Sequence, residues 1–237
     1  MRHLCRPTGA DQNMVQFTKR VAAGERLFRT GARQTGIYAL RSGFMMTSLP
    51  EINGRRFVLR FMLPGDAVGM EALATGEHPT EATAIEDSEV CVIPVRRAEM
   101  LVEFLPAYAA EVRKLLAEQY AEAMAHAILL RRRRADERVA LFLLELSRRS
   151  LVRGFPPEAF PLPMRRYELG EHLNLRFESV SRTLNELQKK GAIEMDGAAV
   201  KIVSLERLRE AAVLHSARPV PYRPRQPRQN STFTCSE

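Results

Sequence analysis

Apolar residues follow a helical period most clearly between residues 165 and 190. Val180, Leu184 and Leu187 recur at intervals of four and three residues, so they share one face of a helix. The opposite face carries Glu178, Ser181, Arg182 and Asn185. A carboxylate, a hydroxyl, a guanidinium and an amide are groups that hydrogen-bond to base edges in a DNA major groove. With a shorter helix before it and a turn at residues 172–175, the segment predicts a helix-turn-helix.

The pattern is different between residues 21 and 94, where short apolar runs are separated by turn residues. Asn53-Gly54, which lies between two extended runs, is typical of a two-residue hairpin. Many short strands at this spacing predict a sandwich or a small antiparallel barrel, and we assign it residues 21–105 after an N-terminal segment 1–20. The strand candidates are residues 27–28, 37–40, 57–63 and 90–93.

After residue 94 the apolar period changes from 2 to 3.6. Residues 96–104 predict a short helix ended by Pro106, and residues 108–134 predict one long helix without internal Gly or Pro. A helix of this length spans about 40 Å, which exceeds a small barrel. It either lies on its own barrel or pairs with a second copy, and we expect a dimerisation helix over residues 106–135. Its apolar seam is Val112, Leu116, Tyr120, Ala123, Ala127 and Leu130.

The C-terminal part predicts a winged helix-turn-helix over residues 136–217. An amphipathic helix at 138–149 and a proline-rich connector at 153–163 precede the two-helix unit. A hairpin around Asp196-Gly197 adds the wing, and a last helix covers about 205–216. Residues 218–237 are rich in Pro and Arg, which predicts a disordered basic tail. The predicted fold class is therefore α+β.

The net charge of +8 is unevenly distributed along the chain. Residues 31–105 hold seven Lys/Arg against ten Asp/Glu, and residues 106–237 hold 23 against 16. A mildly acidic middle beside a basic C-terminal half fits a sensor joined to a nucleic-acid binder. Candidate phosphate contacts are Arg165, Arg166, Lys189 and Lys190, with a solvated surface as the equal alternative.

Three widely spaced cysteines, at 5, 91 and 235, do not form a disulfide framework. No apolar run reaches the roughly 20 residues of a membrane helix, and the N-terminus lacks the apolar core of a signal peptide. We therefore expect a cytoplasmic protein without a membrane partner.

Several motifs in this order resemble the cyclic AMP receptor / fumarate–nitrate reduction regulator (CRP/FNR) superfamily of bacterial transcription factors, and its redox branch in particular. They are GERLFRTG, IYALRSG, PGDAVG, HPT at 78–80, GFPPEAFPLPMRRYELGEHLNL and ESVSR. The resemblance implies a jelly-roll barrel of the cyclic-nucleotide-binding type, also called a double-stranded β-helix. It further implies a homodimer, an activator role and RNA polymerase as a partner.

The resemblance also assigns the DNA-reading residues. Glu178-x-x-Ser181-Arg182 is similar to the reading motif of the redox branch, which implies a palindrome of TTGAT-like half-sites. Arg182 would bond to guanine O6 and N7, and Glu178 would accept from a cytosine amine. The alternative is an i,i+4 surface ion pair between these two residues. Two departures from the family pattern are Asn174 at a turn position commonly filled by glycine and Arg176 in place of a hydroxyl cap.

The signal is less clearly predicted, and we expect oxygen, redox or nitric oxide status. Cyclic AMP is not expected, because His78-Pro79-Thr80-Glu81 stands where family members hold the phosphate with an Arg-Ser pair. Cys5 and Cys91 resemble two of the four ligands of a 4Fe-4S cluster, which would need further cysteines upstream of Met1. Cys91 could instead be a small buried apolar residue, and haem is another alternative that lacks an evident axial histidine.

Two other functions compete with a DNA-binding regulator. A metal-dependent barrel enzyme needs clustered ligands, but the five histidines are scattered at 3, 78, 126, 172 and 215, so we expect no enzyme. A ligand-binding regulatory barrel whose main role is not DNA binding stays open.

Overall fold

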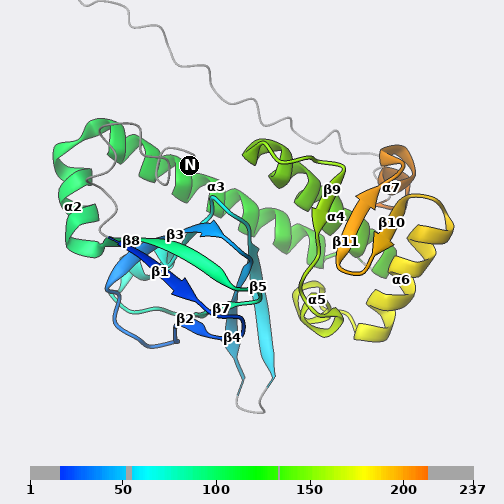
Figure 1. Cartoon of the computed structure of the whole chain (residues 1–237), viewed down its shortest axis with the longest axis horizontal. Helices are drawn as coiled ribbons and strands as arrows, with labels where there is room; N and C mark the ends of the chain where they lie inside the picture. Colours follow the sequence, from blue (N-terminus) through cyan, green and yellow to red (C-terminus); the bar gives the residue numbers. More distant parts are fainter. Residues whose placement is uncertain (1–16, 52–54, 133, 213–237) are drawn as a thin grey trace, which may run out of the picture.

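The computed structural model describes residues 17–51, 55–132 and 134–212. A β-barrel, a long helix and a helix-turn-helix unit follow one another along the chain, which confirms the predicted α+β architecture (Figure 1). Cys5, Cys235, Asn53-Gly54 and the expected tail lie outside the described residues. No helix within the described ranges is both long and apolar enough to span a bilayer.

Two four-stranded antiparallel sheets form the barrel, in the orders β1-β8-β3-β6 and β2-β7-β4-β5. Between them lies an apolar core that includes Leu40, Met45 and Val90. The first strand begins at Phe17, upstream of the expected boundary at residue 21, because Phe17 pairs with Val92 across the sheet. The strands are β1 (Phe17–Val21), β2 (Arg26–Phe28), β3 (Gly36–Ser42), β4 (Met45–Pro50), β5 (Arg56–Met62), β6 (Ala67–Val68), β7 (Glu81–Ala84) and β8 (Ser88–Pro94), with the 3-10 helix η2 (Met70–Ala74) after β6.

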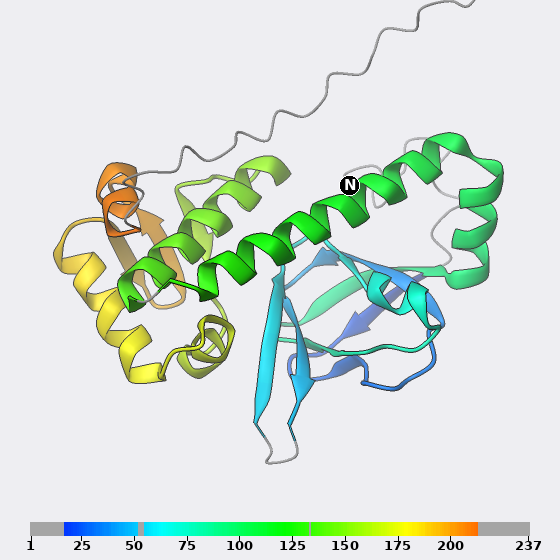
Figure 2. The same cartoon turned by 180° about the vertical axis from the view of Figure 1, so that it is seen from behind.

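Three helices connect the barrel to the helix-turn-helix unit: α2 (Val95–Phe104), α3 (Pro106–Leu130) and α4 (Ala135–Arg153). Helix α3 begins at a proline, whose fixed backbone suits the first turn. It runs along the barrel and continues past it to the C-terminal unit (Figure 2). It ends four residues earlier than expected, because Arg131 and Arg132 form the turn into α4.

The C-terminal unit contains the predicted two helices and wing. Its wing has a third strand, because the expected connector 153–163 supplies β9, which pairs with β11. The described part of the last helix ends at Ala211. The elements are β9 (Ala159–Pro161), α5 (Arg166–Leu173), α6 (Phe177–Lys189), β10 (Ile193–Asp196), β11 (Ala199–Ile202) and α7 (Leu205–Ala211).

One apolar core crosses from the barrel into the helix-turn-helix unit. Phe44 and Phe61 of the barrel belong to the same buried cluster as Leu143 of α4 and Leu173 of α5. Helix α5 packs directly against β5. The two units are therefore held together by apolar burial as well as by the covalent chain.

Candidate nucleic-acid interface

Helix α6 has two faces of opposite character. Val180, Leu184 and Leu187 are at most 1% exposed and belong to the core of the unit. On the other face Glu178, Arg182 and Asn185 are exposed, and Ser181 is partly exposed. Neither Glu178 nor Arg182 takes part in an ion pair within the described ranges. The i,i+4 pair is therefore not formed, and both charged groups are available to a ligand.

The turn between α5 and α6 depends on two special backbone positions. Asn174 adopts the left-handed conformation, with φ 51° and ψ 52°, which Asn tolerates better than most residues. A Cβ on Gly170 would lie 2.6 Å from the Leu175 carbonyl oxygen, so the close approach requires glycine. As expected, Arg176 gives α6 no side-chain cap.

Arg138 of α4 fixes the same turn. Its Nη1 donates to the carbonyl oxygens of Leu173 and Asn174, at 2.9 Å each, and its Nε donates to the Arg132 carbonyl at 2.8 Å. These bonds satisfy carbonyls at the end of α5 that have no partner within the helix. Sequence reasoning missed this role, because Arg138 looked like one of several charged residues on an amphipathic helix.

The four candidate phosphate contacts differ in their surroundings. Arg165, Lys189 and Lys190 are exposed at the ends of the two helices. Arg166 is partly buried, and its Nη2 lies 3.7 Å from the Met195 sulfur of the wing. Burial lowers the pKa of Arg166, which nevertheless stays protonated at neutral pH. Three of the four cations are thus exposed, and the fourth packs against the wing.

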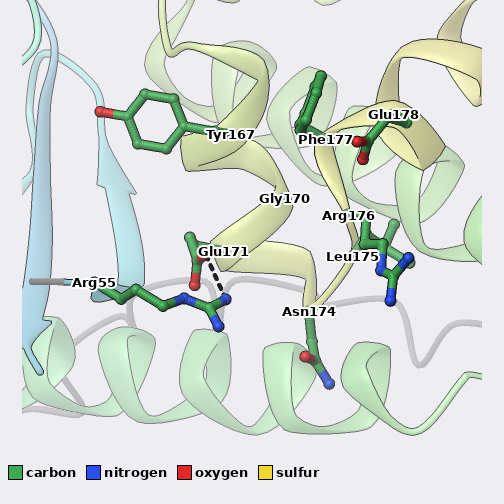
Figure 3. A pocket seen from close by; sticks show the side chains of 9 residues that line it. All are labelled: Arg55, Tyr167, Gly170, Glu171, Asn174, Leu175, Arg176, Phe177 and Glu178. Carbon is green, nitrogen blue, oxygen red and sulfur yellow. Dashed lines mark hydrogen bonds and ion pairs between the residues drawn. The ribbon is translucent and has the colours of Figure 1, made fainter. Parts of the chain in front are cut away.

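A cleft of about 500 Å³ separates the start of α6 from the barrel (Figure 3). On the barrel side, Nη2 of Arg55 pairs with the Glu171 carboxylate at 2.9 Å. Phe177, the first residue of α6, is 54% exposed beside Glu178, a feature that the sequence reasoning did not use. The lining residues are Arg55, Tyr167, Gly170, Glu171, Asn174, Leu175, Arg176, Phe177 and Glu178.

Known proteins share both halves of this architecture. Residues 18–103 match the cyclic nucleotide-binding domain, and residues 137–211 match the Crp-like helix-turn-helix domain. The transcriptional activator protein FnrA of Stutzerimonas stutzeri is 34% identical over 191 residues, which cover 81% of this chain and 78% of that relative. The fumarate and nitrate reduction regulatory protein of Escherichia coli K12 is 33% identical over 200 residues, covering 84% and 80%. The chain belongs to the CRP/FNR family.

The solved structure of FixK2 from Bradyrhizobium japonicum is similar throughout, with a TM-score of 0.76 and 28% identity over 82% of this chain and 96% of FixK2. The CRP/FNR family consists of transcription regulators, so this chain is a DNA-binding regulator and not an enzyme.

Helix α3 of this CRP/FNR regulator presents an apolar stripe to solvent. Of the predicted seam, Leu116, Tyr120, Ala123 and Ala127 are exposed, with Tyr120 at 69%. Val112 and Leu130 are instead partly buried against apolar clusters of their own chain. Met124 and Ile128, which the seam omitted, are about half exposed and widen the stripe.

The barrel of this CRP/FNR regulator does not fit a cyclic nucleotide. Where a cation would meet the phosphate, the buried Glu81 carboxylate instead accepts from Arg26 Nε at 2.8 Å and from Ser48 at 3.3 Å. His78 is 1% exposed and stacks on Phe28 with ring centroids 3.6 Å apart. Burial lowers the pKa of His78, so its ring is neutral and supplies no positive charge. A phosphate there would meet a buried carboxylate whose cation partner, Arg26, is already paired with it.

Cys91 is 3% exposed on β8. By strand alternation it shares a face with Ile93, which packs in the cluster that contains Leu115 of α3. No group of three or more His, Cys, Asp or Glu in the described parts of the chain is arranged to hold a metal ion. One described cysteine does not fit a Cys₄ cluster, and the predicted partner Cys5 lies outside the described residues.

Proposed function

We propose that this regulator binds palindromic DNA as a homodimer and reads TTGAT-like half-sites with α6. The observation that carries the proposal is the exposed polar face of α6, whose opposite face is fully buried. A helix supported in this way has a fixed orientation, and its charged side chains project from the first turns, where recognition helices contact bases.

Each residue on this face has a distinct proposed role. The guanidinium of Arg182 donates two hydrogen bonds to O6 and N7 of guanine, and the Glu178 carboxylate accepts from the amine of the paired or neighbouring cytosine. Ser181 and Asn185 contact adjacent bases. Arg165, Lys189 and Lys190 contact phosphates, which adds affinity without sequence preference. A two-fold dimer places its half-sites about one helical turn apart.

The test compares Arg182→Ala with Arg96→Ala, which removes the same charge from an exposed position on α2. Binding is measured on a TTGAT palindrome and on the same palindrome with the guanines replaced, at several salt concentrations. Arg182→Ala should lose about 1–3 kcal/mol of discrimination per half-site and keep weak, salt-sensitive binding. Arg96→Ala should keep full discrimination. Unchanged discrimination in Arg182→Ala would refute the assigned contact.

The signal that we propose is oxygen, redox or nitric oxide status, and the output is activation through RNA polymerase. The support is similarity to relatives named for fumarate and nitrate reduction and to one named a transcriptional activator. The misfit of the barrel to a cyclic nucleotide also favours another kind of signal.

The signal is tested on protein purified without oxygen and then exposed to air. Iron and sulfide contents and the visible absorption spectrum are measured on each preparation. A cluster contains both iron and sulfide, haem contains iron alone, and a cofactor-free thiol contains neither. The affinity for the palindrome is measured on the same preparations. We expect affinity for the palindrome to change on exposure to air or nitric oxide. Equal affinity in all preparations would exclude such a response.

A further inference from the structure

Two histidines meet where the three parts of the molecule join. His126 lies on α3, and His172 lies on α5 of the DNA-binding unit. Their rings stack with centroids 4.2 Å apart and planes 16° from parallel. Since one ring belongs to the connecting helix and the other to the DNA-binding unit, the stack exists only while the two elements stay docked.

The barrel completes this contact. His172 is 8% exposed, and its Nδ1 lies 3.2 Å from the carbonyl oxygen of Val58 on β5. Phe61 of β5 and Phe142 of α4 present their edges to the His172 ring, at centroid distances of 5.0 and 5.4 Å. Aromatic rings therefore surround His172, and a proton on it would have to be accommodated with little solvent.

The charged groups around the junction offer such a proton no stabilisation. Arg149 of α4 is the charged side chain that acts on His172, and it is repulsive. The nearby carboxylates are already engaged: Glu122 of α3 with Arg60 of β5 at 2.7 Å, and Glu171 of α5 with Arg55. In the described ranges, neither His126 nor His172 forms an ion pair with a carboxylate.

Both rings are consequently neutral in the docked state. Burial, followed by repulsion from His126 and Arg149, lowers the pKa of His172 to about 3. Burial also lowers the pKa of His126. The buried Asp66, held by Arg149, Arg60 and Arg153, has a pKa well below its usual range and keeps its charge under mildly acidic conditions. The histidines are thus the groups at this junction that titrate between pH 5 and 8 once exposed.

We propose that His126 and His172 form a proton-sensitive clasp, which holds the DNA-binding unit on the barrel at neutral pH and releases it under mildly acidic conditions. When the rings separate and meet water, each binds a proton with a pKa of about 6.5. The docked state has the lower affinity for protons, so it loses stability as the pH falls below about 6.5. A histidine that stays neutral in the docked state contributes at most a factor of about 10 in the docking equilibrium per pH unit in that range.

Amide hydrogen exchange tests the clasp without DNA. Its result therefore stays valid even if the proposed DNA contacts prove wrong. Protection factors, which are corrected for intrinsic exchange, are measured for α5 and for the interior strand β3 at pH 7.5 and 5.5. Protection of α5 in the natural protein should fall by about tenfold through His172 and further through His126, to at most about 100-fold, while β3 changes little.

Variants assign the effect to the two rings. His126→Phe preserves the stack, and His172→Asn retains a donor toward the Val58 carbonyl. Each single variant should show a smaller fall than the natural protein, about tenfold for His126→Phe, and the double variant should show none. The matched control His78→Phe changes a buried barrel histidine outside the junction and should behave as the natural protein does.

Three results would overturn the proposal. The first is equal α5 protection at both pH values in the natural protein, which needs no variant to interpret. The second is an undiminished fall in the double variant, which would assign the titration to other groups. The third is loss of the pH response in His78→Phe, which would indicate that the response arises from protonation elsewhere in the fold and not at the junction.

Discussion

At the residue scale, the partly buried Arg138 of α4 holds the turn that leads into α6. Its guanidinium donates to two carbonyls at the end of α5 and to the carbonyl of Arg132, in the turn between α3 and α4. The carbonyls of Leu173 and Asn174 lie where the chain leaves α5 and enters α6, so these two bonds hold the direction of the turn. The side chain therefore acts on DNA reading through the backbone alone.

Arg138→Ala should reduce the free energy of unfolding by about 1–3 kcal/mol, because it leaves partly buried carbonyls without a donor. Arg134→Ala is the control and should cost much less, since Arg134 is exposed and its pair with Asp136 at 2.6 Å is screened by solvent. Urea denaturation of both variants gives the comparison. Equal losses would mean that the turn carbonyls are satisfied without Arg138.

At the element scale, α3 packs on its own chain with one face and exposes apolar residues on the other. Leu115 and Leu129 are buried against the chain's own barrel and DNA-binding unit, and Leu116, Tyr120, Met124 and Ile128 are exposed. Large apolar side chains in a continuous exposed stripe are typical of an interface. This arrangement supports the proposal that a second copy of α3 covers the stripe.

Leu116→Glu and Tyr120→Glu should therefore convert a dimer to a monomer, because the introduced carboxylates would face apolar surface. Ala125→Glu adds the same charge at an exposed position outside the stripe and should leave the dimer intact. Sedimentation equilibrium measures the association directly. Dimers of unchanged affinity in both stripe variants would place the interface elsewhere.

Local periodicity was sufficient to predict the long helix, the two-helix unit and the wing. Val180, Leu184 and Leu187 are all within a few residues of one another, so their common face can be read from spacing. Strand β9 and the bonds from Arg138 to Leu173 and Asn174 could not be predicted in this way, because they depend on partners 35 or more residues away. The predicted seam of α3 stays a prediction, and it coincides only in part with the exposed stripe, since spacing does not tell which apolar residues the chain itself covers.

At the scale of the whole molecule, a buried charge network supplements the shared core. Asp66, in the loop before β6, is 1% exposed and accepts from Arg149 and Arg153 of α4. Arg60 of β5 joins Asp66 to Glu122 of α3. The barrel, the long helix and the DNA-binding unit are thus linked through the carboxylate of Asp66. The sequence does not predict this link, because Asp66 and Arg149 are 83 residues apart.

Asp66→Asn should cost about 3–5 kcal/mol at pH 7, because it leaves the buried Arg149 without its main counter-charge. Burial alone would raise the pKa of Asp66, but Arg149, Arg60 and Arg153 together lower it well below the usual range. The carboxylate therefore stabilises the fold above its unfolded pKa of about 3.9, and this stability is lost as the pH falls further.

The stability difference between the natural protein and Asp66→Asn should accordingly narrow below about pH 4. Denaturant unfolding between pH 7 and pH 3 measures it, with the exposed Asp87→Asn as the control. A variant as stable as the natural protein at pH 7 would show that the network contributes nothing to the fold.

The uninterrupted α3 also restricts how the chain length can vary. Leu115 must face the barrel, Tyr120 must face outward and Leu129 must face the DNA-binding unit, all on one continuous helix. One inserted residue between Leu115 and Leu129 would turn everything downstream by about 100°, whereas seven would turn it by only about 20°. Seven residues would also lengthen the helix by about 10 Å and so move the DNA-binding unit away from the barrel core that it shares. The docked core therefore fixes both the angle and the length of this segment.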